Sequence, residues 1–348
     1  MMLHDQQFIS FAEATAPLFV GVGVAETGLT VGVLDDRGLP LSWGVVLPGT
    51  LDCLEDVLRR THKAVAEVMR QADAPAGAVA RVGLALPGTA DSFFGKLIDV
   101  ADPSDDGKKS LCERSAAVCK LPVSLANDAV AAAFGESWVG AGRSLSSLVL
   151  LMLDARIGCG VIFGDASIDG LGSHGVDAAH MIIQYGPQAP LCPCGQRGHL
   201  QAYLSPDAVA DRVRQSLAGG RASPLAGRLD QGQAATLDLL AQGANAGDPV
   251  SLEIIAEMAR YLAVGIVNLM NTLDPDGVLL SGAMTFGGSS TPLGRQFLQW
   301  VKEEVARRAF ATLAEHTVID FAALGSDAVC YGAAGIARAD HRRSRAGR

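Results

Sequence analysis

The 348-residue sequence contains no uninterrupted apolar stretch of about 18 residues, the length that a membrane-spanning helix requires. Its start, "MMLHDQQFISFAEATAPLF", lacks a cationic segment ahead of a long apolar run, so we expect no signal peptide. Seven cysteines, an odd number scattered unevenly, do not fit the disulfide framework of secreted proteins. We therefore expect a cytoplasmic protein in a reducing compartment, with no membrane partner.

Positive charge is also scarce, since the chain has 28 Lys and Arg residues against 37 Asp and Glu residues and a net charge of -9. This balance argues against a broad nucleic-acid-binding face. Only about twenty residues precede the first expected strand, too few for a helix-turn-helix domain. The exception is the basic run "HRRSRAGR" at 341–348, which we interpret as a disordered, solvated tail rather than a binding arm.

Hydrophobic residues make up 49% of the chain, and its length exceeds one typical domain of roughly 100 to 200 residues. Strand-like runs at 17–24 and 29–38 open the chain, and the same pattern restarts after a glycine-containing hinge, "GAGRS". Two lobes that each open with a hairpin suggest a duplicated fold. The predicted parts are an N-terminal extension 1–16, a first α/β lobe 17–140, a second α/β lobe with a metal loop 141–340 and the basic tail 341–348.

Strands alternate with helices in both predicted lobes. The run 79–86 predicts a strand that ends in a turn at Pro87 and Gly88, and the run 121–128 predicts a buried strand before an alanine-rich helix. Residues 205–274 are predicted to be mostly helical. This alternation predicts an α/β fold with a cleft between the lobes.

A cluster of metal-ligand residue types stands out in "LCPCGQRGHL" at 191–200. Cys192, Cys194 and His199 are close enough for one loop to wrap around an ion, and His180 is the nearest candidate for a fourth ligand. Two histidines and two cysteines form a normal tetrahedral zinc set, and four protein ligands predict a structural zinc. The alternative is a turn with two inert thiols and a surface histidine.

The wider segment "HMIIQYGPQAPLCPCGQRGHLQAYLS" resembles the zinc loop of the ROK family of bacterial sugar kinases and sugar-responsive repressors. In the family pattern a third cysteine stands where this chain has His199, and a glutamate stands where it has Gln201. Further similarity lies in "VGLALPGTAD", "LPVSLANDAVAAAFGE", "VNLMNTLDPDGVLLSGAM" and "YGAAGIA". The resemblance implies an actin-like, hexokinase-type pair of α/β lobes with sugar and ATP in a central cleft.

The resemblance also implies roles for residues of the sugar half. Asp128 would be the catalytic base that accepts the proton of a sugar hydroxyl, although an aspartate at this junction is also a typical helix cap. Asn127, Asp177, His180 and Gln201 would bind the sugar, together with the Pro87-Gly88 turn. His180 would place one ring nitrogen on zinc and the other on the sugar.

The nucleotide half departs from the family pattern. Where ATP-binding members have an aspartate that manages magnesium, this chain has Gly23, and Glu26 is a shifted substitute or an exposed turn residue. The second phosphate turn, Gly-Thr-Gly in the family, aligns with Asp154-Ala155-Arg156. The residues retained toward ATP are Thr27, Gly158, Gly160 and Gly282.

Two functions therefore stay open. One is an ATP- and magnesium-dependent kinase of the glucokinase type that acts on the primary hydroxyl of a hexose or amino-hexose. The other is a catalytically inactive sugar-binding regulator without its own DNA-binding domain. Family members are commonly homodimers or homotetramers, which we expect here as well.

Overall fold

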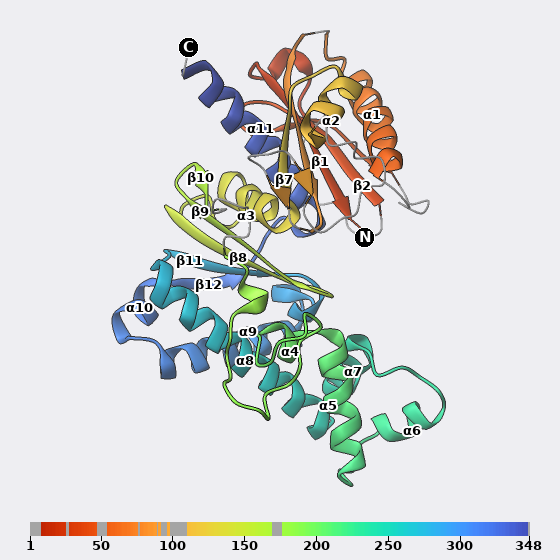
Figure 1. Cartoon of the computed structure of the whole chain (residues 1–348), viewed down its shortest axis with the longest axis vertical. Helices are drawn as coiled ribbons and strands as arrows, with labels where there is room; N and C mark the ends of the chain where they lie inside the picture. Colours follow the sequence, from red (N-terminus) through yellow and green to blue (C-terminus); the bar gives the residue numbers. More distant parts are fainter. Residues whose placement is uncertain are drawn as a thin grey trace. The chain divides into compact units, whose positions relative to one another are not determined.

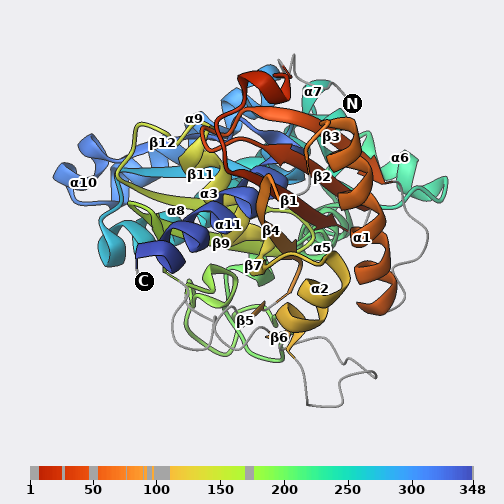
Figure 2. The same cartoon turned by 90° about the horizontal axis from the view of Figure 1, so that it is seen from above.

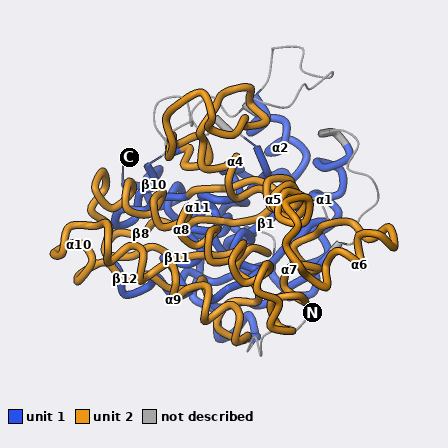
Figure 3. Tube along the Cα trace, turned by 90° about the horizontal axis from the view of Figure 1, so that it is seen from below, with its two compact units in different colours: residues 1–146, 160–176, 323–348 blue, residues 147–159, 177–322 orange. Residues whose placement is uncertain are grey.

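The computed structural model describes residues 8–25, 28–46, 54–75, 77–88, 90–91, 96–97, 110–168 and 176–346. The chain divides into two compact units, which Figure 3 distinguishes by colour. Unit 1 comprises residues 1–146, 160–176 and 323–348, and unit 2 comprises residues 147–159 and 177–322.

Unit 1 is built on a five-stranded sheet with the order β3-β2-β1-β4-β7. The pairs β1–β2 and β2–β3 are antiparallel, whereas β4 and β7 continue the sheet in parallel to β1. The strands are β1 (Leu18–Ala25), β2 (Gly28–Leu34), β3 (Pro40–Val46), β4 (Val79–Leu86) and β7 (Val123–Asn127), with the short pair β5 (Ala90–Asp91) and β6 (Lys96–Leu97). Parallel strands direct their carboxyl ends to the same edge, so β4 and β7 both end beside the end of β1.

Helices cover both faces of this sheet (Figures 1 and 2). On one face, α1 (Leu54–Gln71) and α2 (Leu111–Cys119) pack on β-branched and leucine side chains, as where Val65 and Val68 meet Val22 and Val31. On the other face lie α3 (Asp128–Trp138) and α11 (Ala328–Ala346), whose alanines pack against Phe19 and Ala85. Successive side chains of β1 point to opposite faces of the sheet, so its apolar residues contribute to the core on both sides.

The contact of α11 with the sheet and with α3 is a backbone contact. A Cβ built on Gly21 of β1 would overlap the carbonyl oxygen of Cys330, and one on Gly83 of β4 would overlap that of Ala333. A Cβ on Gly332 of α11 would likewise overlap the carbonyl oxygen of Ala131 in α3. Because these glycines carry no side chain, the backbone of α11 can pack directly against β1, β4 and α3.

The second sheet has the order β10-β9-β8-β11-β12. Strand β11 pairs in parallel with both β8 and β12, and β10 pairs antiparallel with β9. The strands are β8 (Ser147–Leu153), β9 (Ile157–Phe163), β10 (Ala166–Ser167), β11 (Gly277–Ser281) and β12 (Val318–Phe321). The register of β8 and β11 pairs Met152 with Ser281, so the residues that follow these two strands lie side by side.

Unit 2 is mostly helical beyond its strands. Its longest helix is α8, which begins at a proline, is capped by Asp248 and buries 13 of its 25 residues. The helices are α4 (Gln201–Leu204), α5 (Pro206–Ala218), α6 (Leu225–Asp230), α7 (Leu237–Asn245), α8 (Pro249–Leu273), α9 (Pro292–Arg308) and α10 (Ala311–His316), together with the 3-10 turns η2 (Ala178–His180), η3 (Ala283–Thr285) and η4 (Gly288–Ser290).

Two features of the chain's ends differ from the sequence prediction. The basic run at 341–348 is not a disordered tail over its described part, because α11 continues to Ala346 and Arg342 pairs with Asp36 at 2.6 Å. The closing segment 323–348 also groups with unit 1, whereas the predicted second lobe ran without interruption from 141 to 340. Of the described helices, none has the length and hydropathy needed to cross a membrane.

We predict that Gly332→Ala destabilises the protein although alanine is the better helix former. The added methyl group collides with the Ala131 carbonyl group, and overpacking of this kind costs about 1–3 kcal/mol of unfolding free energy. The matched control is Gly227→Ala in α6, where no atom lies within 4 Å of the new Cβ, so stability should stay equal or rise by up to about 1 kcal/mol. Urea unfolding measures both, and equal stabilities for the two variants would contradict the packing described here.

Candidate functional site

The four predicted metal ligands come together in unit 2. The ligand atoms of His180, Cys192, Cys194 and His199 all lie within 4.8 Å of one another, and Cys194 Sγ is 3.2 Å from His199 Nδ1. Cys192 and His199 are buried, whereas His180 and Cys194 are exposed. This donor set has the composition and the closeness that tetrahedral zinc requires.

A small hairpin brings these residues together. The backbone forms isolated bridges between Ile182 and His199 and between Leu191 and Arg197. Gly198 adopts a φ of +80°, and a Cβ there would overlap the carbonyl oxygen of Gln184. The loop is anchored to the body of unit 2 by Leu200, which is fully buried and packs on Gly265 of α8.

Without a cation, the buried part of this cluster favours uncharged groups. Burial raises the pKa of the Cys192 thiol; the backbone N–H of Cys194 opposes this rise, and the Cys194 side chain adds to it. Burial also lowers the pKa of His199, and the nearby His180 lowers it further. A bound zinc ion would reverse this preference for the thiols, because it stabilises thiolates, and would keep the imidazoles neutral.

Asp177 orients one of the metal-ligand candidates. Its Oδ2 atom lies 2.6 Å from Nδ1 of His180, which leaves Nε2 of that ring for a metal. A carboxylate behind a ligating imidazole fixes the ring and its tautomer. The resemblance instead implied that Asp177 and the second nitrogen of His180 would both face a sugar, so here the two groups bind each other.

In unit 1, Asn127 and Asp128 lie at the carboxyl end of β7, where helix α3 begins. Asn127, and not Asp128, is the N-cap, because its Oδ1 accepts hydrogen bonds from the N–H groups of Ala129 and Val130. Its Nδ2 donates to the carbonyl oxygen of Gly88 at 2.7 Å. Asp128 is the first helical residue and accepts a hydrogen bond from the N–H of Ala129.

The Pro87-Gly88 turn therefore belongs to the same group of residues. Gly88 has a φ of +94°, a conformation that favours glycine, and its carbonyl oxygen is held by Asn127. Both polar atoms of the Asn127 amide contact backbone, so this residue positions the strand ends. The structure thus brings together Asn127, Asp128, Pro87 and Gly88 but uses the asparagine differently from the expected sugar contact.

The magnesium position of the family pattern is crowded here. A Cβ on Gly23 would lie 3.1 Å from Cγ1 of Val329 and 3.2 Å from the backbone nitrogen of Cys330, both in α11. A carboxylate at this position would require α11 to shift. Thr27 and Glu26 lie outside the described residues.

The three other glycines assigned to ATP differ in their surroundings. Gly160, in β9, packs closely on α3, since a Cβ there would overlap the carbonyl oxygen of Ala129. Gly158 is half-buried in the same strand. Gly282 has a φ of +95°, and a Cβ there would lie 2.6 Å from the carbonyl oxygen of Leu153. Gly282 thus allows the ends of β8 and β11 to touch.

Gln201 is buried against the turn that replaces the second phosphate turn. Its Oε1 accepts a hydrogen bond from the N–H of Ile157 at 2.7 Å, and its Nε2 donates to the carbonyl oxygen of Ala155 at 3.1 Å. The resemblance implied a sugar contact for Gln201, but here both ends of its amide hold backbone. An amide can do this because it carries a donor and an acceptor, whereas a carboxylate accepts only.

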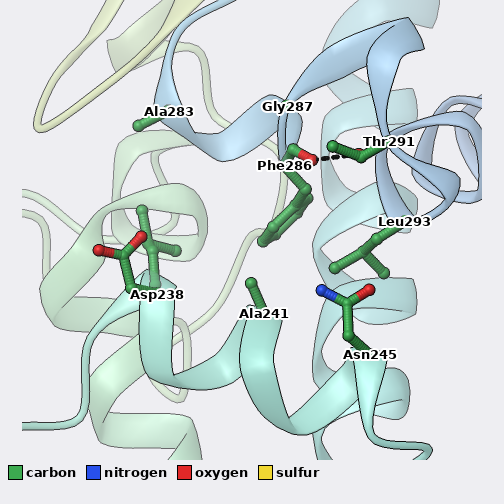
Figure 4. A pocket seen from close by; sticks show the side chains of 9 residues that line it. Asp238, Ala241, Asn245, Ala283, Phe286, Gly287, Thr291 and Leu293 are labelled. Atoms are coloured by element: carbon green, nitrogen blue, oxygen red, sulfur yellow. Dashed lines mark hydrogen bonds between the residues drawn. The ribbon is translucent and has the colours of Figure 1, made fainter.

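Asp154, at the start of the same turn, contacts the residue after Gly282. Its Oδ1 accepts a hydrogen bond from the backbone N–H of Ala283 at 2.8 Å. Ala283 in turn borders a cavity of about 250 Å³ in unit 2 (Figure 4). The cavity is lined by Leu237, Asp238, Ala241, Asn245, Ala283, Phe286, Gly287, Thr291 and Leu293.

Helix α7 and the segment after β11 form opposite walls of this cavity. Figure 4 shows Ala241 and Asn245 of α7 pointing toward the ring of Phe286, with Asp238 on the same helix nearer to Ala283. The wall around Phe286 is held by the hydroxyl of Thr291, which donates to the carbonyl oxygen of Phe286. Sequence reasoning found Gly282 at one edge but not Asp238, Asn245 or Phe286, because no motif marks these three residues.

A sequence profile of the ROK family matches residues 19–340. The chain belongs to the ROK family. This confirms the resemblance that the sequence motifs indicate. The ROK match covers both units and includes the strand ends, the metal loop and the cavity described above.

Curated relatives in the ROK family include kinases and repressors. Glucokinase from Streptomyces coelicolor is 28% identical over 337 residues, which cover 92% of this chain and 98% of that protein. Glucokinase from Halalkalibacterium halodurans is 28% identical over 209 residues, 60% of this chain and 61% of that protein. Xylose repressor from Caldicellulosiruptor bescii is 26% identical over 214 residues, 61% of this chain and 51% of that protein. The matches thus span about three fifths of the second relative and about half of the third.

Solved ROK structures share the fold. A ROK hexokinase from Thermus thermophilus has a TM-score of 0.77 and 25% identity, covering 94% of this chain and 99% of that chain. A ROK family glucokinase from Streptomyces griseus, in complex with glucose and AMPPNP, has a TM-score of 0.70 and 26% identity over 92% of this chain and 99% of that chain. These neighbours confirm the predicted α/β fold of the actin-like, hexokinase type.

We predict that the purified ROK chain contains about one zinc ion per molecule and that Cys194→Ser lowers this content several-fold. Chelation should lower the melting temperature of the wild type, because metal binding stabilises the folded state. The matched control, Cys119→Ser, removes a half-buried thiol outside the cluster and should retain the metal. Elemental analysis and thermal unfolding measure both; metal-free wild-type protein would refute the zinc assignment.

We further predict that Gln201→Glu, which restores the family residue, destabilises unit 2 near neutral pH by about 1–3 kcal/mol, because the carboxylate opposes the Ala155 carbonyl group. Burial beside a carbonyl oxygen raises the pKa of this glutamate in the folded state above its unfolded value. Stability is therefore recovered at low pH and lost as the pH rises through the folded pKa. Urea unfolding between about pH 5 and pH 8 tests this slope. Gln215→Glu on exposed α5 should show no such difference from wild type.

Proposed function

We propose that this ROK chain is an ATP-dependent sugar kinase that phosphorylates the primary hydroxyl of a hexose or amino-hexose. The observation that carries the proposal is the position of Asp128 directly after parallel strand β7, at the first residue of α3. Ligands of α/β sheets bind beyond the carboxyl ends of the strands, and Asp128 is placed at such an end. Glucokinases among the relatives support a reaction of this class.

Asp128 is the proposed general base. A sugar hydroxyl is a weak nucleophile, and a hydrogen-bonded carboxylate accepts its proton as the oxygen bonds to the γ-phosphorus. The bond from that phosphorus to the bridging oxygen breaks at the same time, and ADP leaves. Asn127 supports this step by fixing the start of α3 and the Pro87-Gly88 turn, which holds the Asp128 backbone in place.

We assign the cluster of His180, Cys192, Cys194 and His199 as a structural zinc site. When bound, the zinc ion supplies a four-way cross-link of the loop and no open coordination position. Asp177 and the metal then hold the His180 ring from its two nitrogens. Asp177, through the carboxylate oxygen that does not bind His180, is the proposed sugar contact of unit 2, and the cross-link sets the backbone around it.

The cavity beside Gly282 is the proposed site of the nucleoside part of ATP. Its volume and mixed lining fit a heterocyclic base, with Phe286 as an apolar wall and the Asn245 amide as a polar partner. Asp238 offers a carboxylate that can accept hydrogen bonds from ribose hydroxyls. The Streptomyces griseus neighbour, solved with AMPPNP, supports nucleotide binding in this family. ATP with magnesium is then the second substrate.

A second candidate is a sugar-binding regulator without turnover. Two observations favour it. Helix α11 crowds the position of Gly23, where the family pattern has its magnesium aspartate. Asp154, in the turn that aligns with the family's second phosphate turn, already accepts a hydrogen bond from the backbone N–H of Ala283. Repressors among the relatives show that the family includes proteins with a regulatory role.

We predict that ADP formation depends on an added hexose and that Asp128→Asn lowers kcat by a factor of about 100 or more while sugar binding persists. A coupled ADP assay over a hexose panel and sugar-induced shifts in melting temperature measure the two effects. Asp207→Asn, an exposed acid in the first turn of α5, is the matched control and should retain full activity. If a sugar raises the melting temperature of the wild type but no turnover is detected, the kinase proposal is wrong and the regulator is the better assignment.

A further inference from the structure

The turn that follows β8 places the carboxylate of Asp154 next to Ala283, at one end of the cavity of unit 2. Strands β8 and β11 pair in parallel, with Met152 opposite Ser281. Two residues further along, this register sets Asp154 beside Ala283, although 129 residues separate them in sequence. The contact is therefore dictated by the sheet and not by a flexible side chain reaching across a surface.

Three further features hold this contact in place. Gly282 lets the backbone of Leu153 approach within contact distance, since a Cβ there would lie 2.6–2.8 Å from its backbone atoms. Gln201, which is buried, holds the N–H of Ile157 and the carbonyl group of Ala155 and so fixes the turn behind Asp154. The carboxylate then accepts the Ala283 N–H at 2.8 Å.

A carboxylate on a backbone N–H occupies the same kind of position as a phosphate oxygen. The lining of the adjoining cavity offers no positive charge in compensation: its nine residues, all in the described part of unit 2, include the acid Asp238 and no lysine or arginine. A phosphate group at the Ala283 end of the cavity finds the Ala283 N–H already hydrogen-bonded and is repelled by the negative charge of Asp154.

We propose that Asp154 is a specificity-determining residue that acts as a built-in anion, so that the cavity of unit 2 binds a nucleoside in preference to the corresponding nucleoside phosphate. This inference rests on the proposed use of that cavity for the nucleoside part of ATP. In a kinase, Asp154 raises the concentration of ATP needed for saturation. In a regulator, the same residue makes the uncharged nucleoside the effective ligand.

The test compares the affinities of adenosine and ADP for the complete chain by isothermal titration calorimetry. Without divalent metal, the wild type should bind adenosine about tenfold or more tightly than ADP, because like charges about 4 Å apart repel. Asp154→Asn keeps the size of the side chain and removes the charge, and it should tighten ADP binding by about tenfold while adenosine binding is unchanged. Asp154→Gly should have at least the same effect.

Asp230→Asn is the matched control, since it changes the net charge equally at an exposed position of α6 that does not line the cavity. It should leave the ratio of the two affinities unchanged. Raising the salt concentration should reduce the difference between wild type and Asp154→Asn, because the effect is electrostatic.

Three results would overturn the proposal. One is a wild type that binds ADP as tightly as adenosine, and another is an Asp154→Asn protein with an unchanged ratio. The third is tighter binding of ADP with magnesium to the wild type than to Asp154→Asn, which would make Asp154 a metal ligand. If adenosine binds to neither protein, the proposed nucleotide use of the cavity fails and this inference fails with it, whereas the first three results leave that use intact.

Discussion

The parallel pairing of β8 with β11 is the constraint on which the functional part of unit 2 depends. It aligns the ends of two strands that are far apart in sequence, and Gly282 allows those ends to touch. The turn at 154–156, the first residues of η3 and one end of the cavity are placed by this single register. A shift of the register by one residue would move Asp154 away from Ala283 and turn every side chain of β11 to the opposite face.

Unit 1 uses the same principle with different residues. Its parallel strands β4 and β7 end at Leu86 and Asn127, and the asparagine amide ties the end of β7 to Gly88 in the turn that follows β4. Close backbone contact again depends on glycine, here where α11 crosses β1 and β4 and meets α3. In both units, short polar side chains at strand ends are held by backbone groups, which fixes their positions before any ligand binds.

Much of the fold could be predicted from the sequence because the patterns that mark its strands, helices and metal loop are local. Runs rich in β-branched residues predicted β1 and β2, the strand predicted at 79–86 is β4, and spacing brought Cys192, Cys194 and His199 into one loop. The contacts of Asn127 and Gln201 could not be predicted, since an amide binds sugar or backbone equally well and only the tertiary structure decides. The pairing of Asp154 with Ala283 depends on a register between distant strands. The helical end of α11 was missed because Arg342 finds its acidic partner, Asp36, only in the folded chain.

The membership of α11 in unit 1 has a consequence for synthesis of the protein on the ribosome. Unit 1 includes residues near both ends of the chain, and the face of its sheet that carries Phe19 and Ala85 is covered by residues 328–346. Domains generally fold as they emerge, from the N-terminus onward. Here the part of this face that α11 covers stays exposed until residues 328–346 have been made, by which time all segments of unit 2 are present. Nascent chains of this protein therefore carry an uncovered apolar surface while unit 2 is being made.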